Sequence, residues 1–187
     1  MAKRGLVKQI DKMGGFLSAI DVLAGTRVMV GVPADNDERD DGEITNAEIG
    51  WLMENGIPEQ NVPARPHMVP GVKRAKSKIS DYMKQAGRLA MEGKTDSVVK
   101  ALHAAGTTAV SSIKQVIREG IPPPLADSTI RGRSRGRKGA QKELARRAAG
   151  KAPGVDLVKP LINTGQYLNS ITHVLRRVSK PARKKKV

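Results

Sequence analysis

The stretch TRVMVGVPADNDERDDGEITNAEIGWLMENG, residues 26–56, contains the change of periodicity that decides the fold class. Its first part, residues 26–32, has a valine at every second position, which predicts a strand with one apolar face. Its last part places Thr45 and Glu48 three residues apart before an apolar run, the pattern of a capping box at the start of a helix. Gly56 is the expected end of that helix. A strand followed by a helix predicts a chain that mixes both kinds of element.

Outside this stretch, apolar residues recur every three or four positions in several segments. They predict helices over residues 4–23, 72–91, 98–117 and 141–149, and the Gly14-Gly15 pair is expected to weaken or break the first of these helices. The candidate core residues of the 98–117 helix are Val99, Leu102, Ala105, Val110, Ile113 and Ile117. The segment YLNSITHVLRRV, residues 167–178, is expected to form a second strand that pairs with the first.

Prolines mark two segments that cannot be helical throughout. The segment IPEQNVPARPHMVPG, residues 57–71, contains four prolines and is expected to be extended or turning. The segment IPPPLADSTI, residues 121–130, contains three consecutive prolines and should end the preceding helix. Within the first segment Arg65 is held in the stiff run PARP, so its guanidinium is well placed to bind a carboxylate, within the subunit or across an interface.

These elements predict an α+β fold, in which a small antiparallel sheet packs with several helices, including long central ones. The expected organisation is a single domain over residues 1–178, with an acidic loop at 35–43 and a flexible basic loop at 131–139. A basic C-terminal tail, residues 179–187, is expected to be disordered. A sheet of two strands is marginal in water, so weaker strands or a neighbouring subunit are expected to complete it.

The formal net charge of +16 is concentrated in two segments. Residues 131–151 hold nine basic residues and the single acid Glu143, and residues 176–187 hold seven basic residues and no acid. Residues 35–48 hold seven carboxylates against Arg39 alone. The chain therefore resembles a nearly neutral domain that carries two basic arms and one acidic loop.

The basic arms can bind a phosphate backbone without reading its sequence. The residues expected to contact DNA or an acidic partner surface are Arg131, Arg133, Arg135, Arg137, Lys138, Lys184, Lys185 and Lys186. Both partners stay open, as does simple solvation of the arms. The sequence has only four aromatic residues, which argues against dedicated binding of single strands, because base stacking supplies much of that affinity.

The spacing of the chemically active residue types argues against catalysis and metal binding. His67, His103 and His173 lie at least 36 residues apart and cysteine is absent, so neither a zinc site nor a disulfide is expected. The acids at 35–43 lack the ordered spacing of a calcium loop, and a solvated loop is the favoured interpretation. The sequence contains no nucleophile elbow, P-loop or dinucleotide fingerprint, and no apolar run long enough to span a membrane. We therefore expect no enzyme, no cofactor and no membrane partner.

Three segments resemble, in the same order, the tail-completion, neck or virion-morphogenesis proteins of long-tailed bacteriophages. The first is VMVGVPADND…ITNAEIGWLMENG, similar to a VxVGV strand, a variable loop and a TNAEIAxxxEFG-like helix. The second is IPEQNVPARPHMVPG, similar to IPARPFLRPA. The third is GIPPPLADSTIRGR…KPLINTGQYLNSITHVL, similar to PPLSxxTIxRK…KPLIDTGQLRNSITYxV. Together they cover most of the chain from Arg27 to Leu175, with departures at Asn55, His67 and Asn163, where the family commonly has Phe, Phe and Asp.

The resemblance implies a structural virion protein that forms a hexameric ring at the phage head–tail junction. Such a ring docks on the portal-side connector or adaptor on one side and on the tail terminator or tail tube protein on the other, and its channel can contact the genome DNA backbone. The motif residues expected to shape the fold or an interface are Pro63, Ala64, Arg65, Pro66, Pro160, Leu161, Thr164, Gly165, Ser170 and Ile171. Two alternatives stay open, a tail terminator protein and a basic nucleic-acid-binding protein.

Overall fold

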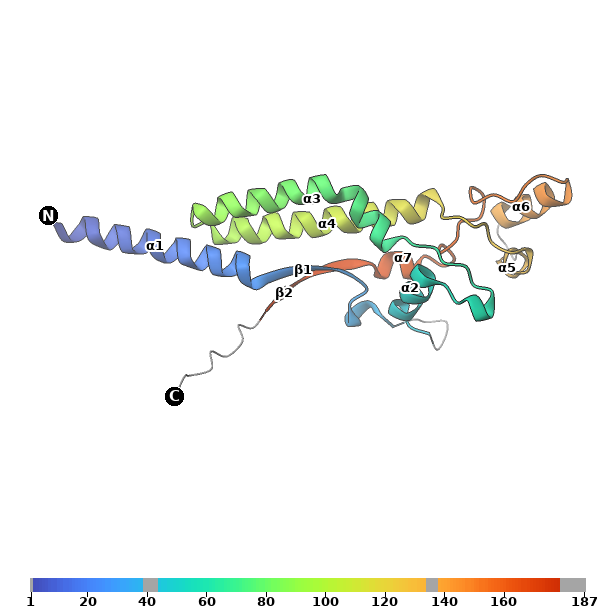
Figure 1. Cartoon of the computed structure of the whole chain (residues 1–187), viewed down its shortest axis with the longest axis horizontal. Helices are drawn as coiled ribbons and strands as arrows, with labels where there is room; N and C mark the ends of the chain where they lie inside the picture. Colours follow the sequence, from blue (N-terminus) through green and yellow to red (C-terminus); the bar gives the residue numbers. More distant parts are fainter. Residues whose placement is uncertain (1, 39–43, 134–137, 179–187) are drawn as a thin grey trace. The chain divides into compact units, whose positions relative to one another are not determined.

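The computed structural model describes residues 2–38, 44–133 and 138–178, with side chains from Met13 onward (Figure 1). Within this part the α-helices are α1 (Ala2–Gly25), α2 (Asn46–Asn55), α3 (Met68–Met91), α4 (Thr95–Glu119), α5 (Asp127–Arg133), α6 (Lys138–Ala148) and α7 (Gln166–Ser170). Two strands, β1 (Thr26–Gly31) and β2 (Thr172–Arg177), pair as an antiparallel sheet. Short 3-10 turns, η1 (Ala34–Asn36) and η2 (Pro58–Gln60), complete the elements. The predicted α+β class is confirmed.

The contacts between elements divide the chain into two compact units. Unit 1 comprises residues 1–30, 76–108 and 173–187, and its described part contains α1, the sheet, and the adjoining halves of α3 and α4. Unit 2 comprises residues 31–75 and 109–172 and contains α2, α5, α6, α7 and the other halves of α3 and α4. The sequence predicts a single domain over residues 1–178, and the division into two compact units does not test that prediction.

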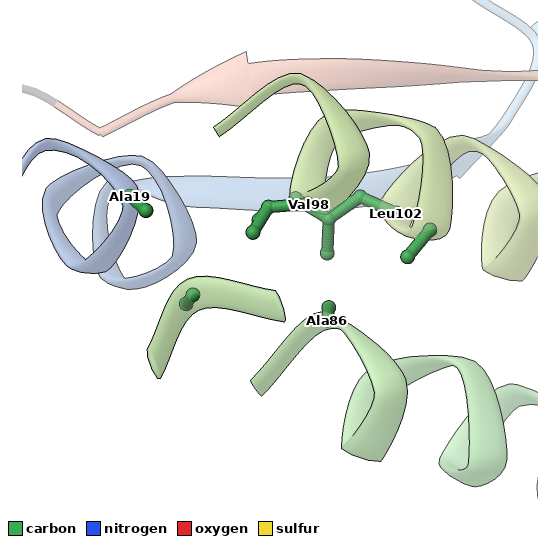
Figure 2. Packing of buried hydrophobic residues seen from close by; sticks show 6 residues of the cluster. Ala19, Ala86, Val98 and Leu102 are labelled. Carbon is green, nitrogen blue, oxygen red and sulfur yellow. The ribbon is translucent and has the colours of Figure 1, made fainter. Parts of the chain in front are cut away.

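The core of unit 1 is built from small aliphatic side chains (Figure 2). Its buried members are Ala19, Ala86, Ala90, Val98, Ala101 and Leu102. Alanines on α1 and α3 let the helix backbones approach closely, and Val98 and Leu102 of α4 fill the space between them. Val28 of β1 and Leu175 of β2 pack against this cluster, so the sheet covers the same core.

In unit 2 the helices α3 and α4 meet at a glycine. A Cβ added to Gly71 would lie 2.6 Å from the Cα of Ile113, so only glycine allows this approach. The Ser112 hydroxyl donates to the Gly71 carbonyl at 2.8 Å and holds the two helices together. A second cluster, Leu125, Ile130, Ala140 and Val158, joins α5 and α6 to the segment that precedes α7.

Several predicted elements need correction. The Gly14-Gly15 pair does not break α1, which runs without interruption from Ala2 to Gly25. The helix predicted to start at residue 72 begins at Met68, because Pro70 lies in the first turn, where its missing N–H has no helical acceptor to lose. Of the candidate core residues on α4, Leu102, Ala105, Ile113 and Ile117 are buried, whereas Val99 and Val110 are half-buried.

Helices are also present in two segments for which the sequence predicted none. The strand predicted over residues 167–178 begins only at Thr172, because Gln166–Ser170 forms α7. The basic loop predicted at 131–139 is instead the end of α5 and the start of α6 on either side of residues 134–137, which lie outside the described part. The acidic loop at 35–43 is partly ordered through η1, and its remaining residues 39–43 also lie outside the described part, as does the predicted tail at 179–187. In the described part, no helix has the length and apolar character needed to cross a membrane.

Candidate binding cleft

The three segments that carry the sequence resemblance line one cleft of about 580 Å³ in unit 2. Helix α2 contributes Ile49 and Met53, and the proline-rich segment contributes Asn61, Val62, Pro63 and Arg65. The remaining wall comes from the segment around α5 and from the KPLINTGQY segment: Pro124, Leu125, Ala126, Thr129, Arg133, Pro160, Leu161, Asn163, Thr164, Gly165 and Tyr167. Residues more than a hundred positions apart in the chain thus form one surface.

Positive-φ residues shape both sides of this cleft. Gly56 ends α2 with φ 78°, and a Cβ there would lie 2.7 Å from the Ala64 nitrogen, so glycine is required for the chain to turn back. The turn is closed by reciprocal backbone hydrogen bonds between Ile57 and Val62, at 2.8 and 3.0 Å. Gly165, with φ 92°, redirects the chain into α7.

Arg65 is the most deeply buried cation of the cleft, with 5% of its surface exposed. Its backbone N–H donates to the Met53 carbonyl at 2.6 Å, which fixes the residue against α2. The guanidinium donates to the Pro123 carbonyl at 3.1 Å and to the Pro63 carbonyl at 3.5 Å, and its Nε has no partner in the described structure. Burial lowers the pKa of Arg65. Among the described residues, the buried guanidinium is therefore held by backbone carbonyl groups.

Behind Arg65 lies a buried group formed by Glu54, His67 and Tyr167. The Glu54 carboxylate accepts the backbone N–H groups of His67, Met68 and Val69 at 2.7, 2.9 and 3.1 Å, so it caps the start of α3. Burial alone would raise the pKa of Glu54, but these three backbone hydrogen bonds outweigh it and hold the pKa below its ordinary value. The carboxylate stays charged and fixes where α3 begins.

The hydrogen bonds of His67 define its tautomer. Its Nδ1 lies 2.9 Å from the Arg65 carbonyl oxygen, which can only accept, so Nδ1 carries the proton. Its Nε2 then accepts a short hydrogen bond from the Tyr167 hydroxyl. Burial lowers the pKa of the fully buried His67, and burial raises the pKa of Tyr167. Both groups are neutral near pH 7 and orient the Tyr167 ring at the cleft wall.

Two residues that depart from the resemblance now have defined packing. His67 occupies a fully buried position, where its ring makes an edge contact with Tyr167 at a centroid distance of 5.5 Å. Asn55 is exposed, and its side-chain amide donates to the Trp51 carbonyl at 2.8 Å. Asn163 lines the cleft.

The basic segment 131–151 is not a uniform arm. Glu143 is fully buried and accepts from Arg146 at 3.0 Å, from Arg147 at 2.9 Å and from the Gly154 backbone at 3.0 Å. Burial opposes the charge of Glu143, but these donors outweigh it and lower its pKa to about 2. Arg147 also donates to the Leu125 carbonyl at 2.9 Å and pairs with Asp127 at 2.5 Å. Two of the arginines therefore stabilise unit 2 instead of facing a partner.

The other predicted contact residues separate into three groups. Arg131 and Lys138 are exposed, at the ends of α5 and α6. Arg133 lines the cleft and donates to the Lys159 and Ile162 carbonyls at 3.4 Å. Arg135, Arg137, Lys184, Lys185 and Lys186 lie outside the described residues.

The predicted motif residues also take different positions. Pro63, Arg65, Pro160, Leu161, Thr164 and Gly165 line the cleft. Ala64 and Pro66 are exposed beside it, and Ser170 and Ile171 are buried. The Ser170 hydroxyl donates to the Tyr167 carbonyl at 2.9 Å within α7, so it supports that helical turn.

Sequence reasoning missed Tyr167, Glu54, Gly50 and Thr129 as parts of this site. One signal was available: Gly50 interrupts an otherwise helical segment, which often marks a close approach. A Cβ on Gly50 would lie 2.9 Å from the Tyr167 hydroxyl oxygen, so the glycine makes room for that ring.

The structure also brings together two histidines that the sequence did not predict to be in contact. His103 of α4 and His173 of β2, 70 residues apart, lie in unit 1 with Nδ1 and Nε2 3.0 Å apart. A Cβ on Gly106 would lie 2.4 Å from the His173 ring, so this glycine admits the imidazole. Burial, and next the nearby His103, lower the pKa of His173. In the described part, no group of three or more His, Cys, Asp or Glu side chains is arranged to hold a metal ion.

Comparison with protein-family models, with curated protein sequences and with solved structures finds no match to this chain.

Proposed function

We propose that this chain is a structural virion protein that forms a ring at the head–tail junction of a long-tailed phage and joins the connector to the tail. The observation that carries the proposal is the cleft of unit 2, because all three segments of the sequence resemblance contribute to its wall. The three segments are separate in the sequence, and in the structure all of them line the cleft of unit 2. In this proposal the chain performs no catalysis and binds no cofactor.

The sheet supports an assembled subunit. In the described part β1 and β2 pair only with each other, which leaves one edge of each strand without a strand beside it. A two-stranded sheet is marginal in water on its own. A neighbouring copy in a ring can cover such an edge through a heterologous contact, in which two different surfaces of the same chain meet.

Exposed apolar side chains support the same conclusion. Trp51, the only tryptophan of the chain, is 66% exposed on α2, and Ile44 beside it is 50% exposed. Tryptophan is enriched among the residues that dominate binding energy at protein–protein interfaces. The proposed ring buries this patch against a neighbouring copy or against the connector.

The charges support a role near the genome. Arg131 and Lys138 are exposed, whereas Arg146 and Arg147 are directed to Glu143. The proposed contact with DNA therefore involves fewer cations than the composition suggested. In this contact the exposed cations bind the phosphate backbone. Such a contact is secondary in the proposal, since joining requires protein–protein docking first.

A deletion of the gene in the phage that encodes this chain tests the proposal. The expected lysate contains free DNA-filled heads beside free tails of normal length, and purified protein added to that lysate restores infectious particles. Overlong tails would instead identify a tail terminator. Intact, infectious particles without the protein would refute the proposal altogether.

A further inference from the structure

The described lining of the cleft of unit 2 carries positive charge. Among its described lining residues are Arg65 and Arg133 and no aspartate or glutamate. Arg65 is 95% buried by its own fold, and its Nε has no hydrogen-bond partner in the described structure. A buried cation held only by carbonyl dipoles is destabilising until an anion reaches it. A planar guanidinium fork selects a carboxylate or phosphate group.

The walls of the cleft fit an extended peptide better than a compact anion. The lining contains apolar side chains, among them Ile49, Met53 and Leu161, together with the hydroxyl of Thr129 and the amide of Asn163. Apolar walls with a few convergent polar groups are the usual composition of a ligand-binding cleft, and extended or helical peptides bind in grooves with apolar pockets. A chain carrying several carboxylates can occupy such a groove over its length and place one of them at Arg65.

The protein itself contains one segment of that chemistry, residues 35–44, with the sequence DNDERDDGEI. In its own copy, the start of this segment is tied to the first turn of α2: the Asp37 carboxylate accepts from the Ala47 N–H at 2.6 Å, and the Asn46 amide donates to the Glu38 carbonyl at 3.1 Å. None of its described carboxylates lines the cleft of the same copy. Opposite charges on two different surfaces of one chain favour a heterologous contact between copies, the kind of contact that can form a ring.

We propose that the acidic segment 35–44 of one copy docks in the Arg65–Arg133 cleft of the next copy. This inference rests on the proposed function, since it names the contact that closes the ring. The carboxylates of the segment supply the anion that Arg65 lacks, and the apolar walls receive Ile44, which is 50% exposed in the free subunit.

A direct binding assay tests the docking. A fluorescent peptide of residues 35–44 is titrated with the full chain, and its anisotropy is followed at physiological salt. The variant Thr129→Glu places a carboxylate in the cleft, and Ser128→Glu places the same charge on the neighbouring residue of α5, which does not line the cleft. We expect Thr129→Glu to weaken binding on the order of tenfold or more, and Ser128→Glu to bind like the parent chain. Both substituted residues are exposed in the first turn of α5, where a glutamate is compatible with the helix dipole.

The outcomes separate docking in the cleft from general attraction to a basic protein. Equal binding by the two variants, or no binding at all, overturns the proposal. So does free citrate that displaces the peptide at equal carboxylate concentration, because it would make the cleft a small-anion site. A peptide in which every acid is replaced by its amide is expected to bind on the order of tenfold or more weakly.

A charge exchange tests whether the occupant is a second copy. Arg133→Glu alters the cleft, and Asp40→Lys with Asp41→Lys alters the segment. We expect the parent to self-associate by light scattering and each variant alone to lose that association. We expect a mixture of the two variants to associate again, because the unchanged segment of one meets the unchanged cleft of the other. If the lysine variant assembles like the parent, the acidic segment is not the occupant and the proposal fails. Because both assays use purified protein, their result does not depend on whether phage heads and tails require the chain.

Discussion

Gly50 decides how α2 and α7 can approach. Its missing side chain leaves room for the Tyr167 hydroxyl, which a Cβ would meet at 2.9 Å. Gly50→Ala should therefore displace the ring, break its hydrogen bond to the buried His67 and destabilise the protein by about 1–3 kcal/mol, as overpacking does in other cores.

The control for this substitution is Gly87→Ala on α3, where an added Cβ meets nothing within 4 Å. The same change there should raise stability by up to about 1 kcal/mol, because alanine is the better helix former. Denaturant unfolding followed by circular dichroism measures both. Equal effects of the two substitutions would contradict the packing described for Tyr167.

Glu143 makes the stability of unit 2 depend on acid pH. Its pKa is about 2 in the folded chain and returns to its ordinary value near 4.5 in the unfolded chain. Between these values the unfolded state binds more protons, so the contribution of this carboxylate is complete above pH 4.5 and is lost as the pH falls toward 2.

Replacing Glu143 by Gln removes the carboxylate that Arg146 and Arg147 share, leaves Arg147 with Asp127, and should destabilise the chain by about 3–5 kcal/mol at pH 7. The difference in unfolding free energy between parent and variant should then shrink between pH 4.5 and pH 3. A difference that stays constant over that range would show that folding does not lower the pKa of Glu143.

At the scale of the elements, the start of α2 offers the clearest test of a feature predicted from neighbouring residues, the capping box. Thr45 accepts from the Glu48 backbone at 3.2 Å, and the Glu48 carboxylate accepts from the Thr45 backbone at 2.8 Å, so the predicted capping box is present. Thr45→Ala should cost about 1 kcal/mol. Thr107→Ala, at an exposed position inside α4, is the matched control and should stabilise by a few tenths of a kcal/mol, about the difference in helix propensity. A loss at Thr107 as large as that at Thr45 would argue against the cap.

The elements that the sequence predicted well are those defined by local chemistry. The strand after Gly25, the cap at Thr45 and the long helices α3 and α4 each follow from periodicity or from one capping residue. The sequence predicted that the strand starts at residue 167, because Tyr167, Ile171 and Thr172 are strand-forming residue types. In the structure the first part of that segment belongs to α7. Gly165 starts a helical turn there, and burial of Tyr167 and Leu168 stabilises it, which local propensity does not report.

The cleft could be predicted only in pieces. Sequence reasoning identified Arg65 as a carboxylate-binding candidate because two prolines flank it closely. It could not find the partner of His67, since Tyr167 lies a hundred residues later, nor the inward pairing of Arg146 and Arg147 with Glu143. Long-range contacts depend on the packing of the whole unit, which composition and periodicity do not determine.

At the scale of the whole molecule, Trp51 should separate folding from assembly. The indole is 66% exposed, so Trp51→Ala should change the unfolding free energy by no more than about 0.5 kcal/mol. In the proposed ring the residue is buried, so the same variant should fail to assemble and to restore joining in the deletion lysate. Because it is the only tryptophan, its emission should also shift to shorter wavelength as the parent protein assembles. Normal joining by Trp51→Ala would remove this patch from the interface.

The most direct test of the proposed joining role is cryo-electron microscopy of the neck in phage particles produced from a genome that carries the gene for this chain. The account predicts a ring of this protein between the connector and the tail, with each acidic segment 35–44 in the cleft of the adjacent copy. A neck built entirely from other proteins, with this chain absent from the particle, would contradict it.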